Sequence, residues 1–186
     1  MRRSFPVAIV VACLTVATGL LAQSVTPDDR AFFDKHIGEF VKLECTPTPV
    51  DSPAVKQAFA ARLYKVQVVL KVTNGTSTEN LVMARVGDTL INIERPGEDQ
   101  DLPEFPKMVN PAFALTTDAA ARTFQQALDE IYPIVGNSDK KVEAFRHAGN
   151  QWIFIRGMFI DTKLGFILTT NAAGSVVAAK FSLKIP

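Results

Sequence analysis

Residues 151–159 read Gln-Trp-Ile-Phe-Ile-Arg-Gly-Met-Phe, and this stretch decides the fold class. Its apolar residues occupy both odd and even positions. Because successive side chains of a strand point to opposite sides, this pattern predicts a central strand with both faces covered. Residues 164–170 and 175–185 follow after short turns and predict further strands, and 141–147 predicts one before it. The last strand alternates between apolar and polar residues, which is typical of an antiparallel sheet with one solvated face.

Three stretches nearer the N-terminus have the apolar spacing of amphipathic helices. The first begins at Thr26-Pro27, the second at Ser52-Pro53, and the third at Thr117 or Asp118, all of which are good helix caps. Between the second and third helices the apolar period changes to two, which predicts antiparallel strands. These strands cover residues 65–72, 81–86 and 90–95.

The predicted fold class is therefore α+β, with one or more antiparallel sheets packed against two or three helices. Residues 96–111 contain four prolines and predict a connector with little regular structure. We expect a single α+β domain over residues 23–186, with possible halves at 23–96 and 112–186. The layout resembles that of cystatin-like or NTF2-like domains, in which a curved antiparallel sheet wraps a helix. Two tandem helix-plus-strands units are the alternative.

Residues 1–22 have the features of a cleavable signal peptide. Arg2 and Arg3 form a positive end, and an uncharged apolar run leads to a small-residue exit at Ala22. The run is shorter than the roughly 20 residues that a membrane span needs. We expect an exported protein, periplasmic or secreted, with no transmembrane span in the mature chain. The arginine pair also partly matches a twin-arginine signal. Lipidation at Cys13 is disfavoured because the apolar run continues beyond it.

The net charge and the absence of known catalytic motifs argue against several classes of function. The chain has 20 Lys and Arg against 19 Asp and Glu, and the leader holds two of the arginines, which leaves a net charge of −1 after cleavage. This balance argues against nucleic acid as a partner. The sequence contains no nucleophile elbow, no phosphate-binding glycine loop and no Cys-x-x-Cys or His-x-x-x-His pair. We therefore expect no catalytic set, no metal site and no cofactor.

The sequence contains a histidine, a cysteine and a group of carboxylates that are candidates for a functional role. We expect His36 at the edge of the buried face of the first helix rather than as a catalytic base. Cys45 is the only cysteine of the mature chain and is predicted to be a small buried hydrophobe rather than a reactive thiol. Carboxylates cluster in the proline-rich connector, but without the spacing of an EF-hand, so a solvated acidic loop is favoured over a calcium site. These carboxylates belong to Glu98, Asp99, Asp101 and Glu104.

Trp152, Phe154 and Arg156 share one side of the 151–159 strand and are the candidate ligand-binding residues. If that side lines a concave sheet, Arg156 can meet an anionic group beside an apolar wall of Trp152. The alternative is a core tryptophan with an arginine that emerges at the strand end.

The function that these patterns favour is a non-catalytic exported module that binds a small ligand or a protein partner, whose identity the sequence does not give. One alternative is a hydrolase or isomerase with its site in the sheet cavity, which NTF2-like architectures permit. The other is an envelope assembly component that uses an exposed sheet edge.

Overall fold

The computed structural model describes residues 25–37, 42–72, 74–93, 98–132, 135–136, 145–159 and 162–185. The predicted signal peptide over residues 1–22, including Cys13, lies outside them. Among the described residues, no helix combines the length and the apolar character that a membrane crossing requires. The chain forms antiparallel sheets accompanied by a few helices, which confirms the α+β class.

The N-terminal elements are α1 (Pro27–Ile37), β1 (Lys42–Val50), α2 (Pro53–Ala58), β2 (Arg62–Val72), β3 (Gly75–Val86) and β4 (Thr89–Asn92). A short strand and a short helix follow, β5 (Gln100–Asp101) and α3 (Phe105–Met108). The C-terminal elements are α4 (Asp118–Ile131), β6 (Val135–Gly136), β7 (Phe145–Ala148), β8 (Gln151–Phe159), β9 (Thr162–Thr170) and β10 (Val176–Ile185).

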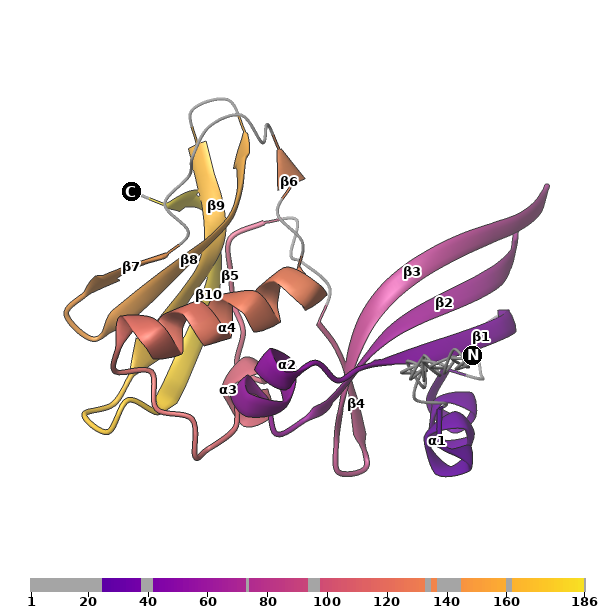
Figure 1. The fold of residues 1–186 in the computed structure, drawn as a ribbon. Coiled ribbons are helices and arrows are strands. Elements are labelled where there is room, and N and C mark those ends of the chain that lie inside the picture. The colour runs from indigo at the N-terminus through magenta and orange to yellow at the C-terminus, as the bar shows by residue number, and fades with distance from the viewer. Residues whose placement is uncertain are drawn as a thin grey trace, which may run out of the picture.

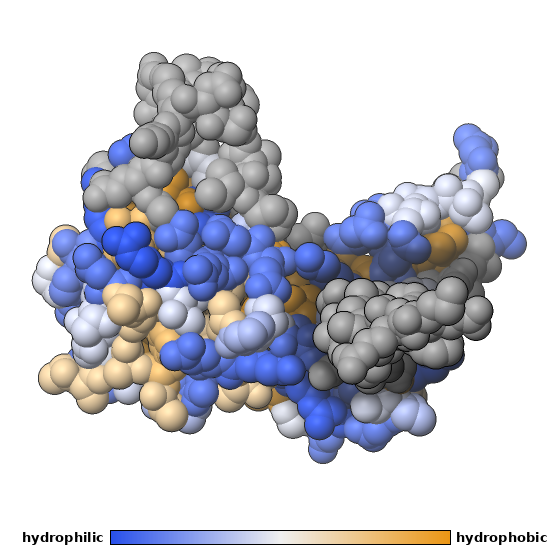
Figure 2. Space-filling model, in the orientation of Figure 1, coloured by the Kyte–Doolittle hydropathy of each residue, from blue (hydrophilic) through white to orange (hydrophobic). Residues whose placement is uncertain are grey.

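The first sheet has the strand order β1-β2-β3-β4, and its β2–β3 hairpin extends away from the rest of the molecule (Figure 1 and Figure 2). Helix α1 covers one face of this sheet. Phe32 and Phe33 of α1 are buried together with Tyr64, Val66 and Val68 of β2. These β2 residues share one parity, because alternate side chains of a strand point to the same face. The residues of the opposite parity, such as the exposed Lys65, face away from α1.

Strand β1 was not predicted, because prolines at 47 and 49 favour a break in regular structure. The structure pairs both prolines with β2, Pro47 opposite Val66 and Pro49 opposite Tyr64. Pro47 and Pro49 are two positions apart, so their nitrogens point to the same side of the strand. The backbone N–H groups of the alternate residues point to the other side and can still donate to β2. An edge strand tolerates this arrangement, and its outer side then lacks two of the donors that another strand would need.

The second sheet has the order β5-β10-β9-β8-β6, with β7 also paired to β8 (Figure 1). Helix α4 lies across it and brings Phe124 within 5.3 Å of the Phe154 ring of β8. On the opposite face of β8, Ile153 and Ile155 are buried with Ile185 of β10. The prediction of a central strand covered on both faces is therefore confirmed.

Residues 98–111 are more regular than their prolines predicted. They contain β5 and α3, and Phe105, Met108 and Val109 are buried. Val109 forms a bridge with Phe59, which follows α2, and the Ala60 N–H donates to the Met108 carbonyl at 2.9 Å. The largest hydrophobic cluster accordingly contains residues from α2, α3, α4 and both sheets. This packing fixes α2 beside the beginning of β2, where a cleft opens.

Candidate functional site

A cleft of about 330 Å³ lies where the N-terminal end of α1, helix α2 and the beginning of β2 meet. Val55, Phe59 and Leu63 give it an apolar wall, and Asp29 and Arg62 give it a polar one. Small-molecule sites are concave, mostly apolar and supplied with a few fixed polar groups, and they start at about 300 Å³. The cleft has these properties, and its residues are therefore the candidate functional site.

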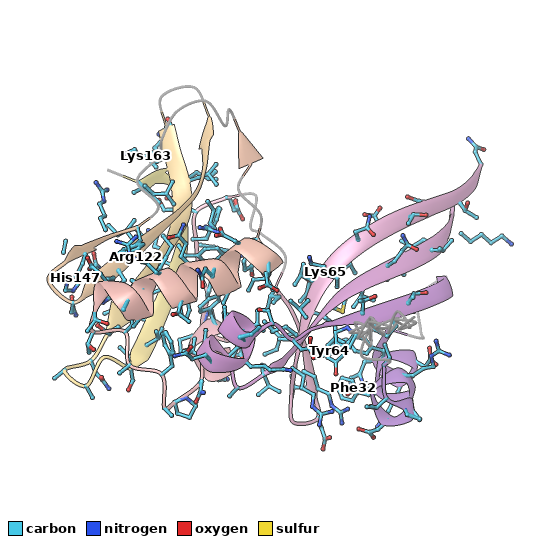
Figure 3. All side chains as sticks on the ribbon, viewed as in Figure 1. Phe32, Tyr64, Lys65, Arg122, His147 and Lys163 are labelled. Carbon is cyan, nitrogen blue, oxygen red and sulfur yellow. The ribbon has the colours of Figure 1, made fainter. Side chains whose placement is uncertain are left out.

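Local sequence explains how the polar wall is built. Thr26 caps α1: its Oγ1 accepts from the Asp29 N–H at 3.1 Å and donates to the Asp29 carboxylate at 2.8 Å. Pro27 suits the first helical position because its missing N–H would have no intrahelical partner there. The cap holds Asp29 against the sheet, and the alternation of β2 turns Tyr64 towards α1 (Figure 3).

Asp29 is a buried carboxylate that collects donors from three elements. Arg62 of β2 donates from Nη1 at 3.1 Å, and Arg85 of β3 donates from Nη1 at 2.9 Å. The Tyr64 hydroxyl and Thr26 also bond to it. Burial by itself raises the pKa of Asp29, but the bonds from Thr26, Tyr64 and Arg85 and the charge of Arg62 outweigh burial and hold its pKa below the ordinary value.

The two arginines that share Asp29 differ in exposure. The Arg85 side chain is 15% exposed, lies 4.2 Å over the Phe32 ring and also bonds to Asp28 at 2.8 Å. The Arg62 side chain is 63% exposed. Its bonds to Asp29 and Tyr64 use part of the five donors of a guanidinium, and the remaining donors can reach a ligand in the cleft. Arg85 therefore holds Asp29 in place, and Arg62 is the arginine that a ligand in the cleft can contact.

Neither titratable group at the base of the cleft changes charge near neutral pH. Burial, followed by the neighbouring Asp29 carboxylate, raises the pKa of Tyr64 to about 12. The pKa of Asp29 moves in the opposite direction. A general acid or base works best with a pKa near the operating pH. These two groups supply a fixed negative charge and a permanent hydrogen-bond donor, which suits binding better than proton transfer.

The structure places the candidate residues of the 151–159 strand elsewhere. Phe154 and Arg156 are fully buried, and Trp152 is 2% exposed. Phe154 packs under α4, and Trp152 lines a separate hollow at the end of the second sheet. Arg156 lies beneath the C-terminal end of α4. Ligand binding by these three residues stays a prediction, since the contacts that Phe154 and Arg156 make are with the protein itself.

Arg156 closes the C-terminal end of α4. Its Nε donates to the Ile155 carbonyl at 3.0 Å, and its Nη1 donates to the Tyr132 carbonyl at 3.4 Å and to the Asp129 carboxylate. A cation at a helix C-terminus is favourable because the last carbonyls carry partial negative charge. Among the described residues, no hydrogen-bond partner reaches Nη2. The guanidinium is therefore desolvated and incompletely compensated.

We expect Arg156→Met to change the free energy of unfolding by less than about 1.5 kcal/mol, because a residue of similar volume removes the desolvation cost along with the ion pair. The remaining Asp129 side chain is 42% exposed and can be hydrated. Arg156→Ala leaves a cavity and is expected to cost about 2–5 kcal/mol. Urea unfolding of both variants checks this. Equal, large losses would show that the ion pair itself is what stabilises the fold.

The other polar candidates are distributed over different parts of the structure. His36 is exposed on α1, and its Nδ1 lies 2.9 Å from the Phe32 carbonyl. Cys45 is half-buried against the apolar cluster under α1. Asp99 accepts from the Leu183 N–H of β10, and Glu104 pairs with Lys107 at 2.8 Å. Among the described residues, no group of three or more His, Cys, Asp or Glu side chains is placed to hold a metal ion.

No protein-family model matches the chain, and no curated protein or solved structure matches it either. The function therefore has to be inferred from the geometry of the cleft. Little in the sequence pointed to this site. Asp29 reads as one of two acids that favour a helix start, and nothing local connects it with Arg62, which lies 33 residues further along.

Proposed function

We propose that the protein is an exported binding module that captures a small amphipathic anion in the cleft between α1, α2 and β2. The observation that carries this proposal is the exposed guanidinium of Arg62, held by a buried carboxylate beside an apolar wall. An anionic head group would take the unused donors of Arg62, and an apolar body would lie against Val55, Phe59 and Leu63.

Two physical arguments support an anion as the head group. A guanidinium offers donors in a planar fork that matches a carboxylate or a phosphate, and such charge-assisted bonds are stronger than neutral ones. Asp29 and Tyr64 already fix one side of the fork, so less side-chain entropy is lost when a ligand binds. Lys56 adds a second cation at the rim, where its exposed pair with Asp51 at 3.1 Å is weak enough to exchange.

The test uses octanoate, octanol and octylammonium, which share an apolar tail and differ in head-group charge. Isothermal titration calorimetry is expected to detect octanoate, with octanol much weaker and octylammonium weakest. Arg62→Gln is expected to reduce octanoate affinity about 10-fold or more, since a bond to a charged group contributes about 1.5–3 kcal/mol. Arg85 still holds Asp29 in this variant, so the fold is expected to persist.

Lys65→Gln is the matched control. It removes a neighbouring cation of β2 that points to the opposite face of the sheet (Figure 3), and we expect it to leave octanoate binding unchanged. Equal affinity for the three probes, or an equal loss in both variants, would contradict the proposal.

The two alternatives from the sequence have less support. General acid–base catalysis works best with a group whose pKa lies near the working pH, and the shifts of Asp29 and Tyr64 go the other way. The cystatin-like or NTF2-like layout, on which that alternative depended, stays a prediction. An assembly role through a sheet edge is disfavoured at β1, where Pro47 and Pro49 remove donors from the outer side.

A further inference from the structure

A second hollow, of about 580 Å³, lies at the end of the second sheet, away from the cleft. Three connections surround it: the turn between β7 and β8, the turn between β9 and β10, and the segment before α4. Backbone bonds join them, since the Thr170 N–H donates to the Asn150 carbonyl and the Leu115 N–H donates to the Gly174 carbonyl, both at 2.9 Å. The hollow is therefore built on a fixed frame, as functional loops commonly are.

Two stacked aromatic rings form one side of this hollow. His147 of β7 lies directly opposite Trp152 of β8, with ring centroids 4.2 Å apart and planes only 14° from parallel. Trp152 is almost completely buried, whereas His147 is exposed at the left end of the molecule (Figure 3). The imidazole therefore presents a flat ring to the hollow, with the indole behind it.

Unused hydrogen-bonding groups lie beside these rings. Trp152 lines the hollow, and the N–H of its indole ring is the donor that this side chain can offer to a ligand. The side chains of Thr116 and Asn150, which also line it, make no hydrogen bond within the described part of the chain.

The hollow differs from the cleft in charge. Within the described part of the chain, its lining includes no carboxylate, ammonium or guanidinium group. The arrangement combines a flat aromatic plate, a buried donor and neutral amide and hydroxyl groups.

We propose that this hollow binds a neutral saccharide ring. The C–H face of a sugar packs on an aromatic plate, while its hydroxyls both donate and accept, which matches an amide, a hydroxyl and an indole N–H. A phosphate or carboxylate ligand would need a cation, and the lining described above offers none besides the His147 ring. This site is independent of the amphipathic anion proposed for the cleft.

The chain carries one tryptophan, so its fluorescence reports on this hollow alone. We expect at least one of cellotriose, chitotriose and maltotriose to shift Trp152 emission in a saturable titration. Octanoate, which is expected to bind in the cleft, leaves that emission unchanged. If none of the three sugars changes the emission, the saccharide proposal is wrong, whatever octanoate does.

Substitutions in the hollow distinguish an effect on sugar binding from an effect on the fold. His147→Ala and Asn150→Ala are each expected to reduce sugar affinity about 10-fold by calorimetry, whereas His147→Phe keeps a flat ring and retains most of it. His36→Ala, which removes an exposed histidine of α1, is the matched control and is expected to change nothing. Unaltered affinity in both His147→Ala and Asn150→Ala would overturn the proposal, because the sugar would then bind elsewhere.

Discussion

Replacing Gly165 by alanine is expected to cost about 3 kcal/mol or more of the free energy of unfolding, at the upper end of overpacking effects. Gly165 of β9 lies opposite Ile155 of β8, next to the bulge that carries Arg156. A Cβ atom added at Gly165 would lie 2.0 Å from the Phe154 carbonyl oxygen and 3.0 Å from the Arg156 nitrogen. Both are backbone atoms, so no flexible side chain can move aside.

Thermal and urea unfolding measure this effect, and Gly87→Ala is the control. At Gly87 an added Cβ meets no atom within 4 Å, but φ is +58°, so only conformational strain of about 1–2 kcal/mol is expected. A Gly165→Ala variant as stable as Gly87→Ala would show that β8 and β9 do not approach as closely as described. The alignment of β8 under α4 would then need revision.

Replacing Asp29 by asparagine is expected to cost about 1.5–3 kcal/mol, because the buried side chain loses its charge-assisted bonds to Arg85 and Arg62, whereas the exposed Arg62 can be hydrated. Asparagine keeps the shape of the side chain but removes the charge that holds Arg62 and Arg85. Since Arg62 then loses its anchor, octanoate binding is expected to weaken as well. Asp28→Asn is the control: Asp28 is 75% exposed and pairs only at the surface, so a loss below about 1 kcal/mol is expected.

The same carboxylate predicts a dependence of stability on pH. The pKa of Asp29 is lower in the folded protein than the unfolded value of about 3.9, so its contribution is complete above that value and disappears as pH falls through the folded pKa. As pH falls below the unfolded value, the wild type should lose stability more steeply than Asp29→Asn. Parallel pH profiles for the two proteins would contradict the role given to Asp29.

Local features of the fold were predictable from the sequence because local residues determine them. Ser52 and Thr117 cap α2 and α4 as expected, with side-chain oxygens that accept from the Val55 and Ala120 N–H groups. The two-faced pattern of residues 151–159 identified β8 as a central strand. Strand β1 was not predicted because prolines usually interrupt a strand. Pro47 and Pro49 are acceptable only because β1 lies at the edge of its sheet, and this position is known only once the sheet has formed.

The candidate site was harder to predict, because it depends on contacts between distant segments. Asp29 meets Arg62 and Arg85 across 33 and 56 residues, and periodicity carries no information about such pairing. The shared parity of Trp152 and Arg156 was correctly identified. However, parity does not reveal that the end of α4 covers Arg156, or that a hollow opens beside Trp152.

The most direct test of the proposed cleft is an NMR measurement of nuclear Overhauser effects between octanoate and the protein. We predict contacts from the octanoate chain to the Phe59 ring and the Leu63 methyl groups, and a chemical-shift change at the Arg62 side chain. Contacts only at the Trp152 hollow or on another surface, or no contacts at saturating octanoate, would contradict the proposal that this cleft binds an amphipathic anion.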